Sequence, residues 1–394
     1  MWQSFFEILF WICLVIVFYT YVGYGMLLYL FVRIKEFFHP YCKPEWQEEL
    51  PEVTLLIAAY NEEKVVEEKM RNCKALNYPP QKLTIAWITD GSNDNTNSLL
   101  AQYPEIKLYF HPERKGKTAA LNRAVPFVTT PYTILTDANT MLNPEAVREI
   151  VNAFADKQTG CVAGEKRIEN NTKDNAASGG EGFYWRYESK LKAWDSRLYS
   201  TVGAAGELFA IQTSLFEPMP ADTLLDDFMI SLRIAEKGYK ITYCASAYAI
   251  EKGSADIRNE QKRKIRIAAG GLQAICRLRS LLNLFKYKTL SFQYISHRVL
   301  RWSVTPVALL LLLPLNTGLA ICSPSLIYRI ILLFQLLFYI LASTGAYFQS
   351  KQIKIKILFI PYYFLFMNLN VIKAFFYYKK FKGKGTWEKA KRAE

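Results

Sequence analysis

The stretch VTLLIAAYNEE, residues 53–63, decides the fold, because a largely apolar run, Val53–Ala59, is followed after one tyrosine by an asparagine and two glutamates. Runs of this kind followed by a polar turn are typical of a strand buried on both faces of a parallel sheet. Two more lie at Leu83–Thr89 and Tyr132–Thr136. Polar helical stretches alternate with them and begin near Glu62, Asp94, Gly116 and Pro144. This alternation predicts an α/β domain over residues 50–250, with a mainly parallel sheet and helices on both faces.

The ends of the chain are richer in apolar residues than the middle. Hydrophobic residues make up 51% of the sequence and aromatic residues 15%, more than a soluble domain of this size requires. Phe10–Val32 contains no charged residue, and a helix of that length crosses a hydrocarbon layer of about 30 Å. The segment lacks the basic start and cleavage site of a removable signal peptide. We therefore expect residues 1–34 to form a retained membrane helix.

More apolar stretches follow the α/β domain. Val304–Cys322 and Ile330–Phe348 are uncharged and long enough to span a membrane, so membrane helices are expected within residues 297–380. Ile357–Ile372 is a weaker candidate because it is shorter and contains Pro361. Before these helices lies a basic segment, residues 251–296, expected to contain an interfacial helix or a plain surface helix near residues 267–285.

Basic residues predict the orientation in the membrane. Arg33 and Lys35 follow the first helix, so the positive-inside bias places the α/β domain in the cytoplasm. The basic tail, residues 381–394, should also be inside, yet three crossings after the domain would place it outside. Two arrangements remain open: three crossings against the charge bias, or a last apolar segment that is re-entrant or lies in the interface.

The formal net charge of +14 suits nucleic acid, anionic lipid or a phosphorylated substrate. No zinc-finger spacing or aromatic RNA-binding motif supports nucleic acid, so no nucleic-acid partner is expected. The seven cysteines are scattered and form no CxxC pair, which is typical of buried residues in a reducing compartment.

Candidate binding residues follow the first two strands, because ligands bind at the carboxyl ends of strands in such sheets. Asn61 and Glu62 end the first strand, and Asp90 ends the second, where its carboxylate can accept hydrogen bonds from a base or ribose. The alternative for the segment around Asp90 is a turn with a helix cap.

A basic turn, HPERKGKTAALN, begins the next helix and contains Lys115 and Lys117. Cations beside free backbone N–H groups at a helix N-terminus form an anion site suited to a diphosphate. It is not a Walker P-loop, and a solvated basic turn is the alternative.

The third strand ends in TILTDANT, where Asp137 and Asn139 can project to one side of an extended segment. Their oxygens suit Mg²⁺ or Mn²⁺, which would neutralise a diphosphate leaving group. A cap for the following helix is the alternative.

The stretch LLDDFMISLRIAEKGY begins with paired carboxylates, Asp226 and Asp227. One carboxylate is enough to cap the helix that follows. The second can act as a general base if a pocket of low dielectric raises its pKa toward the working pH. Further on, RNEQKRKIR contains Gln261, Arg263 and Lys264 just before the membrane region, where a lipid-facing basic run is the alternative.

Taken in order, the motifs resemble the family-2 glycosyltransferases with the GT-A fold, a Rossmann-like α/β fold. The resemblance is strongest to bacterial enzymes related to hyaluronan, cellulose and poly-N-acetylglucosamine synthases. It rests on Asn61-Glu62, Asp90, Lys115-Gly116-Lys117, Asp137-x-Asn139, Asp226-Asp227 and Gln261.

The resemblance implies a role for each motif. Asp90 would contact the nucleoside, Lys117 the nucleotide, and Asp137 with Asn139 the metal-bound diphosphate. Asp227 would be the catalytic base, and Gly206 and Glu207 would line the acceptor site. The implied reaction is an inverting transfer, in which an acceptor hydroxyl attacks the anomeric carbon as the nucleoside diphosphate departs.

Two departures from the family pattern stand out. Asn139 replaces the second metal-binding acid, which affects the affinity or identity of the metal. The QxxRW motif of processive members appears only as Gln261-Lys-Arg-Lys264-Ile265, so the tryptophan expected over the acceptor sugar is missing. Tyr184, Trp185 and Trp194 could stack on sugars instead, with core packing as the alternative.

We therefore expect a multi-pass protein of a bacterial inner membrane that moves a hexose or N-acetylhexosamine from a UDP-sugar. The acceptor would be a polysaccharide or a lipid-linked glycan at the inner leaflet. A secretion partner is expected if the product must cross the membrane. The alternatives are an enzyme that makes a single transfer to a lipid, and a membrane protein whose nucleotide-binding module is not catalytic.

Overall fold

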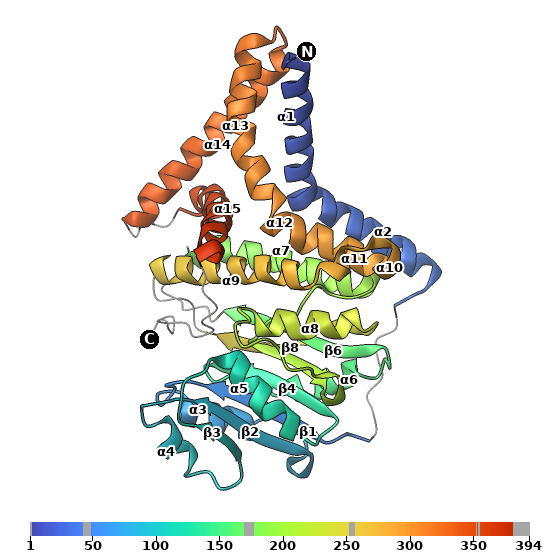
Figure 1. Cartoon of the computed structure of the whole chain (residues 1–394), viewed down its shortest axis with the longest axis vertical. Coiled ribbons are helices and arrows are strands. Elements are labelled where there is room, and N and C mark those ends of the chain that lie inside the picture. Colours follow the sequence, from blue (N-terminus) through green and yellow to red (C-terminus); the bar gives the residue numbers. More distant parts are fainter. Residues whose placement is uncertain are drawn as a thin grey trace.

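The computed structural model describes residues 2–41, 49–168, 177–251, 257–351, 353 and 355–380. In Figure 1 the sheet lies at one end of the molecule and the apolar helices at the other, with a layer of helices between them. The predicted basic tail, residues 381–394, lies outside the described residues.

Within the described residues, eight strands form one mixed sheet in the order β3-β2-β1-β4-β7-β6-β8-β5. Pairing is parallel among β1, β2, β3 and β4 and between β6 and β8, while β7 is antiparallel to both of its neighbours. The expectation of an α/β domain with a mainly parallel sheet is confirmed. The strands are β1 (Val53–Ala59), β2 (Leu83–Asp90), β3 (Lys107–His111), β4 (Tyr132–Asp137), β5 (Thr140–Leu142), β6 (Thr159–Ile168), β7 (Leu208–Gln212) and β8 (Lys240–Glu251).

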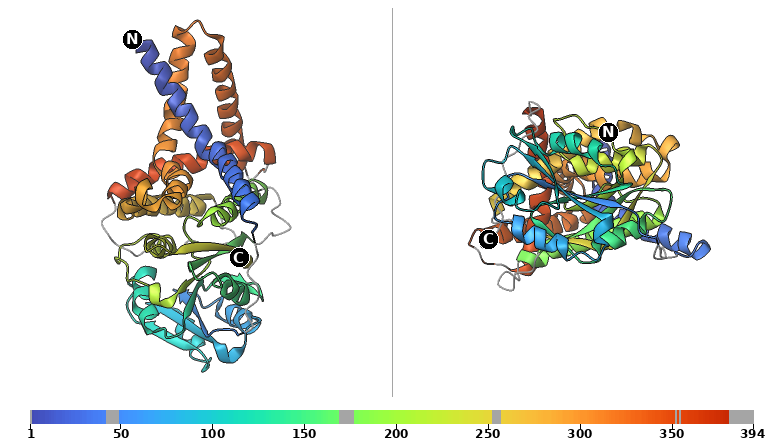
Figure 2. Two further views of the ribbon diagram at one scale, coloured as in Figure 1. Left: turned by 90° about the vertical axis from the view of Figure 1, so that its right-hand side faces the viewer. Right: turned by 90° about the horizontal axis from the view of Figure 1, so that it is seen from below.

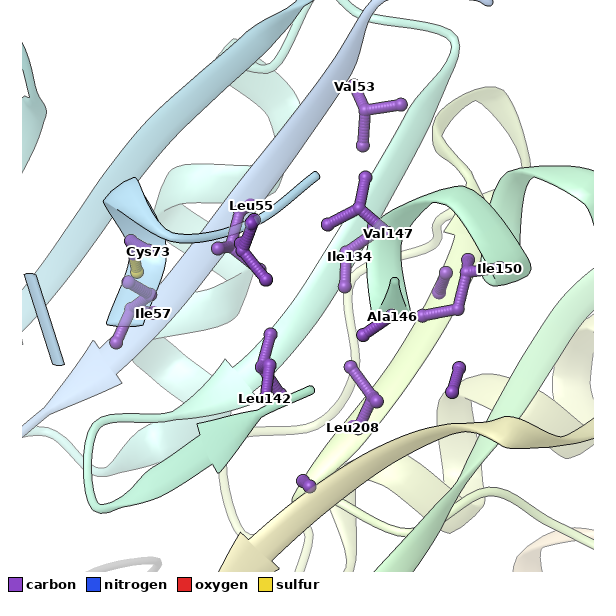
Figure 3. Close-up of a cluster of buried hydrophobic side chains, with 14 of the residues drawn as sticks. Val53, Leu55, Ile57, Cys73, Ile134, Leu142, Ala146, Val147, Ile150 and Leu208 are labelled. Carbon is purple, nitrogen blue, oxygen red and sulfur yellow. The ribbon is translucent and has the colours of Figure 1, made fainter. Parts of the chain in front are cut away.

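Helices cover both faces of this sheet. Alternate residues of β1 enter two different cores: Leu55 and Ile57 pack with Val147 and Ile150 (Figure 3), whereas Leu56 faces the opposite core. Burial on both faces explains why the strand is apolar apart from the buried Thr54. The helices and helical turns of the domain are α3 (Val66–Lys74), η2 (Pro80–Lys82), α4 (Thr96–Leu100), α5 (Lys117–Ala124), η3 (Val125–Phe127), α6 (Ala146–Ala153), η4 (Thr213–Leu215) and α8 (Asp226–Glu236).

A layer of helices separates the sheet from the apolar helices (Figure 1). The helix predicted near residues 267–285 has other bounds in the structure: α9 begins at Ile257 and ends at Arg277. Its two glycines are sites of close packing: a Cβ on Gly270 would come within 2.5 Å of Leu225, and one on Gly271 within 2.4 Å of Trp302. The layer consists of α7 (Ala177–Leu198), α9 (Ile257–Arg277), η5 (Arg279–Leu282), α10 (Leu284–Tyr287), α11 (Thr289–Tyr294), η6 (Ile295–Val299) and α12 (Leu300–Trp302).

Four helices are long and apolar enough to cross a membrane by length and composition. Three of them pack side by side around Phe10, Leu312 and Tyr328 and run along the long axis of the molecule (Figures 1 and 2). They are the continuous helix Trp2–Phe38, formed by α1 (Trp2–Phe18), η1 (Tyr19–Gly23) and α2 (Tyr24–Phe38), then α13 (Val304–Cys322) and α14 (Leu326–Ser350).

The fourth apolar helix, α15 (Lys356–Lys380), has a different direction. It lies across the base of the other three, against α9, as Figure 1 and the left view of Figure 2 show. The C-terminal ends of α14 and α15 are therefore on the side that faces the sheet. This geometry favours the second of the two arrangements left open by the charge pattern, a last apolar segment in the interface.

Candidate active site

A cavity of about 1050 Å³ lies between the carboxyl ends of the strands and the helical layer. One wall comes from the ends of β1, β2 and β4 and from the N-termini of α5 and α8. The other wall comes from α7, α9, η6, α12 and α15. Eleven of the residues proposed from the sequence line it: Glu62, Asp90, Lys117, Asp137, Asn139, Gly206, Glu207, Asp226, Asp227, Arg263 and Lys264.

Asp90, the last residue of β2, organises the turn that begins α5. Its Oδ2 accepts hydrogen bonds from the backbone N–H groups of Lys115 at 2.8 Å and Gly116 at 2.6 Å. Its Oδ1 is buried and accepts no hydrogen bond from the described residues. Gly91 follows with φ +67°, and a Cβ there would lie 2.5 Å from the backbone nitrogen of Arg114. Only glycine fits this turn. The second carboxylate oxygen of Asp90, Oδ1, lies 3.6 Å from Arg123 Nη2 and on the cavity side of the turn.

Lys117 connects the acidic residues at the ends of β4 and α8. Its Nζ lies 2.6 Å from Asp137 Oδ1 and 3.6 Å from Asp226 Oδ2. Burial would lower the pKa of Lys117, but the two carboxylates outweigh burial and hold the pKa above its usual value. A fixed positive charge therefore lies where three motifs, separate in the sequence, come together.

Asp227 lies beside this cation, in the first turn of α8. Burial, followed by the charge of Asp226, raises the pKa of Asp227 to about 7, against the lowering effect of Lys117. A Cβ on Gly206 would lie 3.2 Å from Asp227 Oδ2 and 3.3 Å from Lys117 Nζ, so glycine permits this close approach. A carboxylate with such a pKa can accept a proton near neutral pH.

Glu207 lines the cavity and belongs to an ion-pair network whose other members are largely buried. It pairs with Lys166, which also pairs with Glu251, and Arg263 Nη2 lies 3.2 Å from Glu207 Oε1. Burial alone would raise the pKa of Glu207, but Lys166 and Arg263 hold it far below its usual value. The network fixes α9 against β6 and β8, since Arg263 is on α9 and Lys166 on β6.

Three predicted residues are not among those that line the cavity. Asn61 bonds through its side chain to Asn93, with Oδ1 accepting from the Asn93 backbone N–H at 2.9 Å, and has φ 53°. The Lys115 side chain is exposed and pairs with Glu113 at 3.4 Å, although its backbone N–H binds Asp90. Gln261 donates from Nε2 to Asn370 Oδ1 of α15 at 3.1 Å.

The sequence analysis missed most of the helical wall. Glu188 on α7 is buried and lies 2.7 Å from Arg298 Nη2 and 2.8 Å from Arg301 Nη1, and all three line the cavity. His297 completes the cluster through Glu188 at 3.1 Å and Asp195 at 2.6 Å. A sequence feature that could have revealed this cluster is the segment SHRVLRW, which places three basic residues directly before an apolar span. Charged side chains next to a membrane span are costly unless they have partners.

The aromatic residues proposed to stack on sugars lie in different places. Trp185 lines the cavity, and the centre of its ring lies 5.4 Å from Lys264 Nζ. Trp194 packs on Tyr29 of α2 at 5.3 Å, away from the cavity, and the side chain of Tyr184 lies outside the described residues. Core packing therefore explains Trp194, whereas Trp185 remains a candidate for sugar contact.

Comparison with known proteins identifies the domain that carries the strand-end motifs. Residues 54–218 match the family of sequences described as Glycosyl transferase family 2. The chain carries a family-2 glycosyltransferase domain. Its matched range includes β1 to β4 and therefore Asp90, Lys117, Asp137 and Asn139, while Asp226 and Asp227 lie just beyond it.

Curated relatives of the family-2 domain support this assignment. The chain is 27% identical over 242 residues to a poly-β-1,6-N-acetyl-D-glucosamine synthase of Staphylococcus aureus, which covers 58% of this chain and 57% of that protein. It is also 27% identical over 261 residues to the probable glycosyltransferase YdaM of Bacillus subtilis, covering 62% and 61%. The chain thus spans less than two thirds of the length of either relative.

A solved structure confirms the fold around the family-2 domain. A mannosyltransferase of Pyrobaculum calidifontis, solved in complex with GDP-Man and Mn²⁺, superposes with a TM-score of 0.68 at 21% identity. The match covers 94% of this chain and 99% of that one, so it includes the apolar helices as well as the sheet. The expected GT-A fold with helical N- and C-terminal segments is confirmed.

Proposed function

We propose that this protein is a membrane-bound inverting glycosyltransferase that moves a hexose or N-acetylhexosamine from a UDP-sugar to a polysaccharide or lipid-linked acceptor. The observation that carries the proposal is Asp227, a half-buried carboxylate whose pKa is raised to about 7, beside a fixed cation in a cavity that reaches the apolar helices. The identity of the family-2 domain agrees with it.

The nucleotide end of the cavity supports binding of a nucleoside. Asp90 Oδ1 lies 3.6 Å from Arg123 Nη2 but accepts no hydrogen bond from the described residues, so it can accept one from a base or ribose, while the turn uses the other oxygen. The Arg114 guanidinium lies 3.9 Å from the centre of the Tyr60 ring, and both residues line this end. The pair forms an aromatic and cationic surface suited to a planar base.

The transfer itself follows from the placement of Asp227 and Lys117. The acceptor oxygen attacks the anomeric carbon, its proton passes to the Asp227 carboxylate, and the bond from that carbon to the diphosphate oxygen breaks. The negative charge that develops on the diphosphate lies toward Lys117. Preorganised charge of this kind is worth about 10²–10³ in rate in other enzymes. Attack from the side opposite the leaving group inverts the anomeric centre.

The donor set at the end of β4 fits a hard divalent cation held jointly with a diphosphate. Asp137 and Asn139 offer oxygen ligands, and Asp226 Oδ2 is buried without a hydrogen bond among the described residues. In the part of the chain that the structure describes, no cluster of three acidic, His or Cys residues forms a complete site. Mg²⁺ commonly takes one or two protein carboxylates and the substrate phosphates. When bound, Mg²⁺ or Mn²⁺ would supply Lewis-acid neutralisation of the leaving group.

The membrane arrangement supports action at the inner leaflet. The sheet, α9 and both ends of α15 lie on one side of the three long apolar helices. Lys35, in the last turn of α2, donates to the backbone oxygens of Arg197 and Leu198 at the end of α7, which puts it on the side of the sheet, as the positive-inside bias requires of a cytoplasmic domain. The multi-pass location in a bacterial inner membrane, with the cytoplasmic domain bound to lipid through α15, is part of this proposal.

The test measures UDP release by detergent-purified protein from a panel of UDP-sugars with Mg²⁺ or Mn²⁺. Asp227→Asn is expected to lower release about 10³-fold with the active donor, because the general base is lost. Asp156→Asn, an exposed aspartate that pairs with Lys240, is the matched control and should leave release unchanged. Equal release by wild type and Asp227→Asn, or no binding of any UDP-sugar, would refute the proposal.

A further inference from the structure

The proposed ligands of the divalent cation lie at a very short loop. Asp137 is the last residue of β4 and Thr140 the first residue of β5, so only Ala138 and Asn139 lie between the two strands. In the sheet β4 is held on both sides, by β1 and by β7. β5 is three residues long and is the terminal strand of the described sheet, paired with β8 alone. The spacing between the oxygen ligands of Asp137 and Asn139 therefore depends on how firmly β5 is held.

Two side chains of α3 bind the edge of β5 that faces this helix. Asn72 forms two hydrogen bonds with the backbone of Leu142: its Oδ1 accepts from the N–H at 2.9 Å, and its Nδ2 donates to the carbonyl at 2.8 Å. Lys69, one turn earlier in α3, donates from Nζ to the backbone carbonyl of Thr140. Backbone groups at the edge of a sheet have no strand partner. The two side chains therefore take the place of a neighbouring strand.

Lys69 is a costly residue at this position. Its side chain is fully buried, and its ammonium group forms no ion pair with any residue that the structure describes. Burial lowers the pKa of Lys69 to about 8, although Cys73 and Asp137 act to raise it. A neutral amide could donate one hydrogen bond to a carbonyl at a lower cost of burial, so packing alone does not explain the lysine. A charged donor forms a stronger hydrogen bond, which indicates that the position of the Thr140 carbonyl matters.

Thr140 connects the contact with α3 to the loop. Its carbonyl accepts from Lys69, while its hydroxyl donates to the backbone carbonyl of Asp137 at 2.9 Å. Thr136, on β4, donates from its hydroxyl to the backbone carbonyl of Glu207 at 2.8 Å. The loop is thus fixed by contacts on both strands, and the contacts of β5 lead to α3.

From these contacts we propose that Lys69 and Asn72 are positioning residues for the site that binds the metal and the diphosphate. They hold β5, and through it Asp137 and Asn139, in the arrangement that a divalent cation requires. Neither of the two, both within the described residues, is among those that line the cavity, so they act without touching substrate. The inference rests on the proposed function and adds two residues to its metal site. Asn139 offers an amide where a carboxylate would bind a hard cation more strongly, so this site gains more from well-oriented ligands.

The first experiment measures the Kd of Mn²⁺ for the full-length protein in detergent with saturating UDP, from the EPR signal of free Mn²⁺. Lys69→Met removes the charge and the donor but keeps the length of the side chain, and Asn72→Ala removes both hydrogen bonds to Leu142. Each variant should raise the Kd about tenfold, because residues that orient metal ligands typically contribute that much. Lys74→Gln, in an exposed pair with Glu105 at the end of α3, is the matched control and should leave the Kd unchanged.

Three further measurements separate positioning of the ligands from damage to the fold. Binding of uridine, which has no phosphate, should be the same in the wild type and both variants, because the turn at Asp90 is unchanged. UDP release by each variant should recover as the Mn²⁺ concentration is raised, since the variants lower only the affinity for the metal. In metal-free protein, hydrogen exchange within residues 137–142 should be about tenfold faster in Asn72→Ala, the value of one lost hydrogen bond, and unchanged in β1.

An unchanged Kd of Mn²⁺ in both variants would overturn the inference even if hydrogen exchange in β5 were faster, because Lys69 and Asn72 would then stabilise only the strand. Loss of uridine binding together with Mn²⁺ binding would also overturn it, since the whole domain would then be damaged. If Lys69→Met does not fold, Asn72→Ala decides, because its side chain is only half-buried. Failure of the proposed function would appear differently: the wild type would bind no UDP at any Mn²⁺ concentration, and the inference would be refuted with it.

Discussion

The two walls of the cavity differ in how they are built. The strand wall carries single residues at strand ends, such as Asp90 and Asp137, each set by a short local turn. The helical wall is a network in which Glu188 and its basic partners come from helices over a hundred residues apart. The first wall suits a ligand common to many enzymes, a nucleoside diphosphate, whereas the second can change to suit the acceptor. Variants in each wall should therefore fail in different ways.

Glu188→Gln is expected to have the largest effect, and on stability. It leaves Arg298 and Arg301 buried without their shared carboxylate, which costs about 3–5 kcal/mol in comparable buried pairs. Thermal unfolding in detergent should show a Tm lower by several degrees, with the Kd for UDP unchanged in the folded fraction. Glu113→Gln, at an exposed surface pair, is the control. A large loss of UDP affinity in Glu188→Gln would mean that the two walls act as one site.

Lys117→Gln tests the strand wall. Loss of the cation beside Asp137 and Asp226 should lower kcat/KM about 10²-fold, with little change in Tm. Lys115→Gln, two residues away with its side chain in solvent, should remain within about twofold of wild type. Steady-state UDP release measures both. A comparable loss in the two variants would show that the exposed lysine, predicted from the sequence, also binds substrate.

The pH profile tests Asp227 itself. The carboxylate must be ionised to accept a proton, and its pKa is raised to about 7, so kcat/KM should fall about tenfold per unit below that pH. The folded state holds this proton more tightly than the unfolded chain, so the stability it contributes is present at low pH and is lost as the pH rises through about 7. Asp227→Asn should therefore raise Tm at pH 8 and leave it unchanged at pH 3.

A flat profile between pH 5 and 8 would contradict the assignment of the base. An equal change of Tm for Asp227→Asn at pH 8 and at pH 3 would also contradict it. The change could not then arise from the cost of burying the ionised carboxylate, which is present only at the higher pH.

Asn139→Asp should have the smallest effect. A second carboxylate strengthens a hard-cation site, so the Mn²⁺ concentration for half-maximal UDP release should fall severalfold. Gln102→Glu, which adds the same charge on an exposed surface, is the control. An unchanged metal requirement would show that Asn139 is not a ligand and that Asp137 acts with other groups.

These walls also differ in how far the sequence predicts them. Val53–Ala59 and the runs like it are apolar because both faces are buried, so periodicity identifies β1, β2 and β4 and the residues that end them. The cation at Lys117 was expected from a helix N-terminus, and it does meet Asp137 and Asp226. Their roles in binding and catalysis remain predictions until the variants are measured.

The helical wall could not be predicted from the sequence in this way. Glu188 lies in a polar helix with no motif, and its meeting with Arg298 and Arg301 depends on how α7 packs against η6 and α12. The orientation of α15 was likewise left open, since hydropathy reports length and apolarity but not direction. Gln261 was expected near substrate and contacts α15 instead, because the helix that carries it starts ten residues earlier than the predicted one.

The position of α15 has a practical consequence. One face of this helix lines the cavity, and Phe375 and Phe376, on the outside, are 45% and 60% exposed. In the proposed arrangement the bilayer would contact those phenylalanines and would thereby become part of the enzyme. Turnover should then respond to lipid packing and bilayer thickness, and a preparation in a harsh detergent would lose activity before its sheet unfolds. The lipid composition used for reconstitution would therefore affect the measured activity, as the side chains of the active site do.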